Sequence, residues 1–163
     1  MDKLDIVTDE SGNKVVLLPE IIFSNKQNIN WDNVEDYLGK YVGELIEIAE
    51  TRDIIYIGNK FPDEYGGSSY TRKTKGARAK AKANAAQGIR EMVEIATDKV
   101  YRENHKEKHS EDAHNGWFYY VTRFAIPLYD NEKKTGEYNV YSACLVVNHA
   151  ANGKMYLYDV VDI

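Results

Sequence analysis

The stretch WFYYVTRFAIPLY, at residues 117–129, has the residue pattern that decides the fold. Its side chains alternate between two faces, as they do in a β-strand. One face holds Trp117, Tyr119, Val121, Arg123 and Ala125, and the other holds Phe118, Tyr120, Thr122, Phe124 and Ile126. Because the second face is apolar except for Thr122, we expect it to line the core, whereas Arg123 interrupts the first face.

Two further strands are predicted downstream, YNVYSACLVVNH at residues 138–149 and KMYLYDVVDI at residues 154–163. The segments DNEKKTGE and AANG separate the three strands, and the second of these is short enough for a tight hairpin turn. We therefore expect an antiparallel meander. Its pairing places Ser142 close to Arg123 on the less apolar face.

The part of the chain before the meander predicts two helices. The first begins after Asn30, a residue suited to cap it, and carries an apolar stripe from Val34 onward. The second spans residues 77–99. Between them lie a short strand at residues 53–58 and a stretch rich in glycine and proline at residues 59–76, which we interpret as a long exposed loop. The apolar patch at residues 15–23 predicts a short strand and a turn.

The predicted fold is therefore α+β, with two N-terminal helices followed by an antiparallel meander of about four strands. A length of 163 residues with 43% hydrophobic residues fits a single domain over residues 1–163, of which residues 1–29 are poorly defined. The chain has no apolar run of membrane-spanning length and no signal-peptide pattern, so we expect a soluble cytoplasmic protein without membrane contact. The scattered carboxylates and the single Cys144 favour neither a metal nor another cofactor.

The distribution of charge is uneven. The net charge is −5, yet residues 72–82, here called the basic segment, hold six cations and no carboxylate, namely Arg72, Lys73, Lys75, Arg78, Lys80 and Lys82. This clustering favours a polyanion as partner, RNA or another nucleic acid, with phosphate contacts made by the six cations. The alternative is an alanine-rich helix that lysine keeps soluble.

Several strings resemble a known family. EYGGSSYTRKTKG, AKAKANAAQGIREMVEIATDK, GWFYYVTRFAIPLYD and YNVYSACLVVNHAANGKMYLYDVVDI resemble a domain of large polyvalent proteins from phages and mobile elements. That domain is similar to the barnase/EndoU/colicin/RelE-like nuclease group, and the resemblance covers residues 53–163. It implies a small α+β domain that cleaves RNA without metal, by attack of the 2′-hydroxyl group on the phosphate.

Such a reaction needs a base, an acid and a cation that stabilises the extra charge on the phosphate. The candidates are His109 and His149 for proton transfer, Arg123 for phosphate binding and Ser142 as a donor to a phosphate oxygen. Each has a structural alternative: exposed loop or turn histidines, an Arg123 ion pair with a helix carboxylate, and a buried serine.

Other expectations remain open beside these. Five tyrosines are candidates for stacking on bases, or else for the edge of the core: Tyr119, Tyr120, Tyr141, Tyr156 and Tyr158. Two other functions are compatible with the sequence. One is a nucleic-acid-binding module that does not cut, and the other is an accessory or anti-defence protein that binds a host protein through its acidic body.

Overall fold

The computed structural model describes residues 3–24, 28–103 and 115–163. The first half of the chain alternates short strands and helices: β1 (Ile6–Thr8), β2 (Lys14–Leu17), α1 (Trp31–Leu38), the 3₁₀ turn η1 (Gly39–Tyr41), β3 (Leu45–Glu47), β4 (Ile54–Tyr56), α2 (Phe61–Gly67) and α3 (Ser69–Lys73). The second half continues with α4 (Gly76–Ala85), η2 (Ala86–Gly88), α5 (Ile89–Glu94), β5 (Thr97–Arg102), β6 (Trp117–Asp130), β7 (Lys133–His149) and β8 (Met155–Val161).

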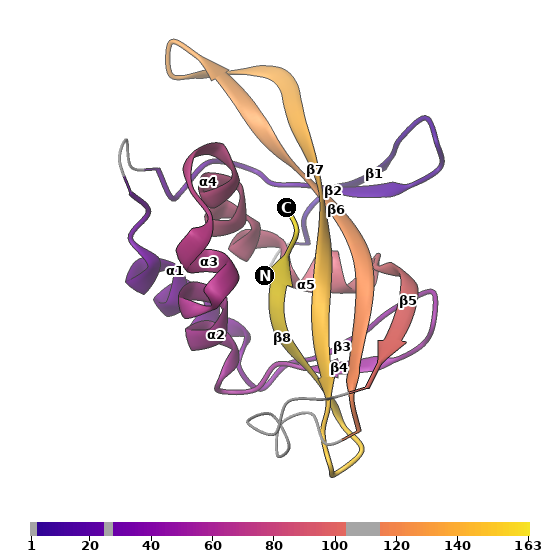
Figure 1. Cartoon of the computed structure of the whole chain (residues 1–163). Coiled ribbons are helices and arrows are strands. Elements are labelled where there is room, and N and C mark those ends of the chain that lie inside the picture. The colour runs from indigo at the N-terminus through magenta and orange to yellow at the C-terminus, as the bar shows by residue number, and fades with distance from the viewer. Residues whose placement is uncertain (1–2, 25–27, 104–114) are drawn as a thin grey trace.

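The described strands form one mixed sheet of eight strands in the order β1-β2-β6-β7-β8-β4-β3, with β5 also paired to β6 (Figure 1). The pairs β2·β6 and β4·β8 are parallel and the others are antiparallel. The chain is thus α+β, but the predicted order of two helices followed by a meander of about four strands is wrong. Short strands from the first half of the chain complete both sides of the sheet, so the sequence order of elements does not match their spatial order.

The predicted pairing of the three long strands is confirmed. Phe124 lies opposite Tyr141, and Arg123 lies opposite Ser142, along the antiparallel β6–β7 ladder. The connection predicted at residues 130–137 is mostly strand. The chain reverses within two residues, Asn131 and Glu132, which both adopt positive φ, at 48° and 67°. The outer half of this hairpin projects beyond the rest of the sheet, and residues 129–140 are exposed (Figure 1).

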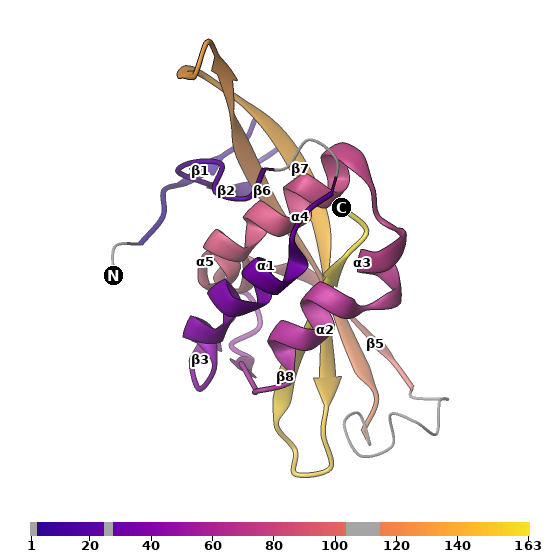
Figure 2. The same cartoon turned by 90° about the vertical axis from the view of Figure 1, so that its left-hand side faces the viewer.

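The helices form three regions, α1–η1, α2–α3 and α4–η2–α5, which Figure 2 shows side by side in front of the sheet. Asn30 caps α1 as predicted, since its side chain accepts from the backbone N–H of Asn33. The loop predicted at residues 59–76 is wrong. Pro62 sits in the first turn of α2, where its missing N–H costs nothing, and Ser68 caps α3. Among the described residues, no helix is long and apolar enough to cross a membrane.

The alternation predicted for β6 is confirmed by burial from Tyr119 to Phe124, whereas Ala125, predicted on the opposite face, is also buried. Tyr120, Thr122 and Phe124 are buried beneath the helices, and the hydroxyl of Thr122 donates to the carbonyl oxygen of Met92 at 2.7 Å. The opposite side of the sheet, here called the open face, is only partly buried at Tyr119 and Val121. The core therefore lies between the helices and one face of the sheet.

Two carboxyl groups meet where α1 packs on α2. Burial, followed by a hydrogen bond with Asp63 and its negative charge, raises the pKa of Glu35 to about 7. The carboxyl of Glu35 lies against Gly66, where an added Cβ would come within 2.5 Å of its Oε2 atom. Because two ionised carboxylates repel each other, a protonated Glu35 fits the contact with Asp63 better than an ionised one.

We expect Glu35→Gln to make the protein more stable than the wild type at pH 8, by about 1 kcal/mol once solvent screening is allowed for. Because folding raises the pKa of Glu35, its favourable contribution to the free energy of unfolding is complete below pH 4.5 and is lost as the pH rises toward 7. Urea unfolding at pH 4 and pH 8 measures the difference. Asp63→Asn should weaken the pH dependence, and a stability difference that did not change with pH would contradict the assignment.

Candidate nucleic-acid interface

Five of the six predicted cations lie on the surface around the junction of α3 and α4. Here they are called the surface cluster, and they are Arg72, Lys73, Lys75, Arg78 and Lys80. Among the residues that the structure describes, none of the five forms a salt bridge. Arg72 is oriented by its own helix region, since its Nε donates to the carbonyl oxygen of Gly67 at 2.8 Å.

A hollow of about 420 Å³ lies within the surface cluster. Arg72, Lys75 and Lys80 line it together with Trp31 and Thr74. The cations thus line a concave site that also includes an aromatic residue, whereas the hydroxyl of Thr74 already donates to the carbonyl oxygen of Tyr70 at 2.6 Å. This combination is suited to a phosphate with an attached base.

The position of the cations on α4 is unfavourable for the helix itself. Arg78 lies in the first turn, Lys75 occupies the N-cap without a side-chain hydrogen bond, and the first turn has no acidic residue. Cations near a helix N-terminus oppose the helix dipole, so they raise the local positive potential at some cost in helix stability. An anion at this surface would offset that cost.

Lys82, the sixth predicted cation, is placed differently. Its side chain is fully buried, and its Nζ lies 2.7 Å from Asp159 Oδ1 of β8 and 2.6 Å from Thr71 Oγ1. The ammonium also lies over the rings of Tyr65 and Tyr70, at 4.6 and 5.0 Å. Since this group joins α2, α3, α4 and β8 inside the protein, we assign it to the folded structure and leave it out of the interface.

Burial acts on both partners of this pair. It lowers the pKa of Lys82 and raises the pKa of Asp159, and in each case the charge of the partner opposes the shift. The backbone N–H of Val160 also donates to Asp159 Oδ1 at 2.8 Å. The pair is therefore satisfied only while both members and their hydrogen-bond partners stay in place.

The predicted catalytic residues that the structure describes do not converge. Arg123 and Ser142 are neighbours on the open face, where Ser142 is exposed and Arg123 makes no ion pair with a described helix carboxylate. His149 lies seven residues further along β7, roughly 23 Å away at about 3.3 Å per residue, and its ring contacts Phe118. His109 lies outside the described residues, so the catalytic role of these four residues stays a prediction.

The five candidate tyrosines divide between the two faces of the sheet. Tyr120 and Tyr141 belong to the helix-covered face, where Tyr120 donates to Asp53 Oδ2 at 2.7 Å and Tyr141 stacks on Phe124. Tyr119 belongs to the open face, with the guanidinium of Arg102 lying 5.5 Å from its ring, whereas Tyr156 and Tyr158 are half-buried beside the start of α2. The role of these five tyrosines in stacking on bases therefore stays a prediction.

Sequence reasoning missed the contributions of Trp31 and Thr74 to the hollow, because residues far apart in the chain meet there. It also missed the burial of Lys82. The sequence did contain a signal for it: Asp159 is an acidic residue within an apolar strand, and Lys82 lies within a run of alanines that the structure buries. Two isolated opposite charges in apolar surroundings are expected to pair.

Comparisons with protein-family models, curated proteins and solved structures found no match to this chain. The resemblance to a phage nuclease-like domain therefore stays a prediction. The surface cluster and its hollow are the features of the described residues that bear most directly on function.

Proposed function

We propose that this protein binds RNA, as single strands, through the surface cluster at the α3–α4 junction. The observation that carries the proposal is the hollow that Arg72, Lys75 and Lys80 line together with Trp31. None of these cations is neutralised by a carboxylate of the described residues, so their charge is available to phosphate groups. Unpaired bases can stack on the indole while the cations contact the backbone.

The remaining charge of the protein supports the same mode of binding. The net charge is −5 although the surface cluster is strongly positive, so the rest of the molecule repels a polyanion. An RNA strand is then confined to one side of the protein. Binding of this kind depends on backbone phosphates and is therefore sensitive to salt and tolerant of sequence.

The arrangement favours binding over cleavage. A ribonuclease site needs a base, an acid and a cation around one phosphate, and Arg123 and Ser142 lie far from His149. Cleavage remains a separate proposal, suggested by the resemblance alone. Incubating RNA with the wild-type protein in EDTA, with His109→Ala and Arg123→Ala as comparisons, tests it on a denaturing gel.

We expect the affinity for a fluorescein-labelled single-stranded RNA of twelve nucleotides to fall steeply between 50 and 300 mM KCl. With three to five phosphate contacts, the slope of log K against log salt should be about −2 to −3.5. Fluorescence anisotropy in EDTA measures it. A slope near zero, or no retention of RNA at 50 mM KCl, would contradict the proposal.

A further inference from the structure

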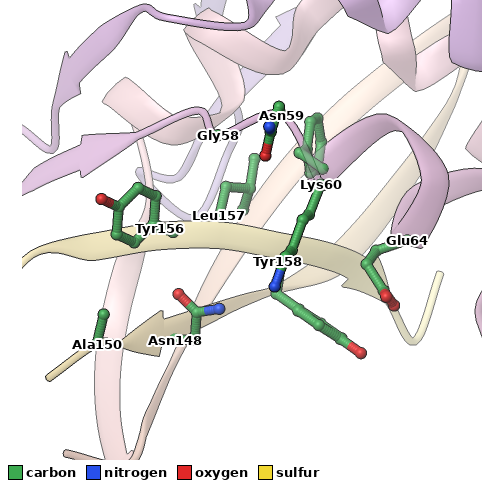
Figure 3. A pocket seen from close by; sticks show the side chains of 10 residues that line it. Gly58, Asn59, Lys60, Glu64, Asn148, Ala150, Tyr156, Leu157 and Tyr158 are labelled. Carbon is green, nitrogen blue, oxygen red and sulfur yellow. The ribbon is translucent and has the colours of Figure 1, made fainter. Parts of the chain in front are cut away.

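A second hollow lies beside β8, away from the surface cluster. Its volume is about 290 Å³, and it lies between the segment that leads from β4 into α2 and the adjoining parts of β7 and β8 (Figure 3). Lys60 and Glu64 come from the start of α2, Asn148 comes from β7, and Tyr156 and Tyr158 come from β8. Figure 3 shows these polar and aromatic side chains around one space.

Asn148 is the unusual member of this group. Its side chain lines the hollow, the residue is only 8% exposed, and its Oδ1 atom is buried without a hydrogen-bond partner among the described residues. Buried amide oxygens almost always have a partner, because an unpaired one loses its hydration without compensation. The carboxamide therefore places an unpaired acceptor, Oδ1, at the wall of the hollow.

The two tyrosines of the hollow are held by their neighbours. The ring of Tyr158 lies edge-on to Trp117 at 5.0 Å between ring centres, and the ring of Tyr156 lies 5.6 Å from that of Tyr56. A Cβ at Gly58 would lie 3.3 Å from Tyr156 Cδ2, so the backbone approaches this ring closely. Rings fixed in this way give a planar ligand an apolar surface at little cost in side-chain entropy.

We propose that this hollow binds a nucleobase that carries an exocyclic amine, adenine in particular. The carboxamide of Asn148 can pair with adenine by accepting from N6–H and donating to N7. The amine has a second N–H, for which the carboxylate of Glu64 is an acceptor on the same wall. The inference deepens the proposed RNA binding, because it assigns a base preference to a second site on the same protein.

The lining also predicts which bases are disfavoured. Hypoxanthine has the ring system of adenine but presents O6 in place of the amine, so both O6 and N7 accept hydrogen bonds. Asn148 Oδ1 and the carboxylate of Glu64 would then face an acceptor, and buried polar groups would be left unpaired. Lys60, whose side chain also lines the hollow, supplies a cation for the phosphate of the same nucleotide.

Adenosine and inosine monophosphates, which differ at position 6 of the base, make a matched pair of probes. We expect the wild-type protein to bind AMP about tenfold more tightly than IMP in calorimetric titrations. Asn148→Leu should abolish this difference, and Glu64→Gln should reduce it. Glu64→Gln is the second test, in case the leucine variant does not fold. Lys133→Gln, at an exposed position of β7 outside both hollows, should leave the ratio of AMP to IMP affinity unchanged.

Equal binding of the two nucleotides, or binding of neither, would overturn the inference. Either result would leave the proposed RNA binding intact if labelled RNA were still retained with a steep salt dependence. Loss of RNA retention with a preserved preference for AMP would instead overturn the proposed function and support the hollow as a nucleotide site. A tenfold preference that persisted in both Asn148→Leu and Glu64→Gln would also overturn the assignment.

Discussion

Replacement of Lys82 by methionine is expected to lower the free energy of unfolding by about 3–5 kcal/mol, the largest stability effect predicted for this protein. The substitution keeps most of the apolar stem but removes the ammonium that lies 2.7 Å from Asp159 Oδ1. Asp159 is 2% exposed, so its carboxylate would stay buried without a cation. Urea unfolding followed by circular dichroism measures the change in midpoint and slope.

The effect should depend on pH. In the methionine variant, burial still raises the pKa of Asp159, and the lowering effect of Lys82 is gone. A group whose pKa is raised by folding stabilises the folded state at low pH and loses that contribution as the pH rises. The deficit of Lys82→Met relative to wild type should therefore be larger at pH 8 than at pH 5.

The double variant Lys82→Met, Asp159→Leu is the matched control for the pair. Because it removes both charges together, it should recover much of the stability that the single substitution loses. A loss below about 1 kcal/mol in the single variant, or a double variant less stable than either single variant, would contradict a buried ion pair as the main connection between α4 and β8.

Replacement of Arg72, Lys75 and Lys80 by glutamine is expected to weaken RNA binding by about 100-fold at 0.1 M salt. These three cations line the hollow beside Trp31, and each phosphate contact with single-stranded RNA contributes about 0.7 to the salt slope. The slope should therefore become shallower by about 2. Anisotropy titrations of the labelled RNA across the same salt range measure both quantities.

A control variant with the same change in charge separates this site from general attraction. Lys14, Lys133 and Lys134 are exposed and belong to β2 and β7, outside the helical region that carries the surface cluster. Their replacement by glutamine should change the affinity only a few-fold. If the two triple variants lost equal affinity, the binding would reflect net charge and the assignment to the surface cluster would be wrong.

The sequence was most informative where local patterns and burial agree. The alternation in residues 117–129 predicted the buried face of β6, and the short AANG turn predicted that β7 and β8 are neighbours. Asn30 predicted the start of α1 because a helix cap depends on the next three residues alone. These features depend on contacts within a few residues or between consecutive strands.

The elements that prediction missed depend on distant contacts. Strands β1, β3 and β4 are three residues each, and β4 is placed by pairing with β8 about a hundred residues later in the chain. Residues 59–76 have the glycines and proline of a loop, yet they fold as α2 and α3 because Tyr65 and Phe61 are buried in the core. The second hollow could not be foreseen for the same reason, since α2 forms one of its walls.

The projecting half of the β6–β7 hairpin implies an uneven distribution of local stability. The inner half of the hairpin is covered by helices on one side and flanked by β2, β5 and β8, whereas residues 129–140 are exposed and, within the described part of the chain, pair only with each other. Backbone amides open locally most easily where few buried apolar contacts hold the strands together. Amide hydrogens near Tyr138 should therefore exchange with deuterium much faster than those near Phe124, although both belong to the same pair of strands.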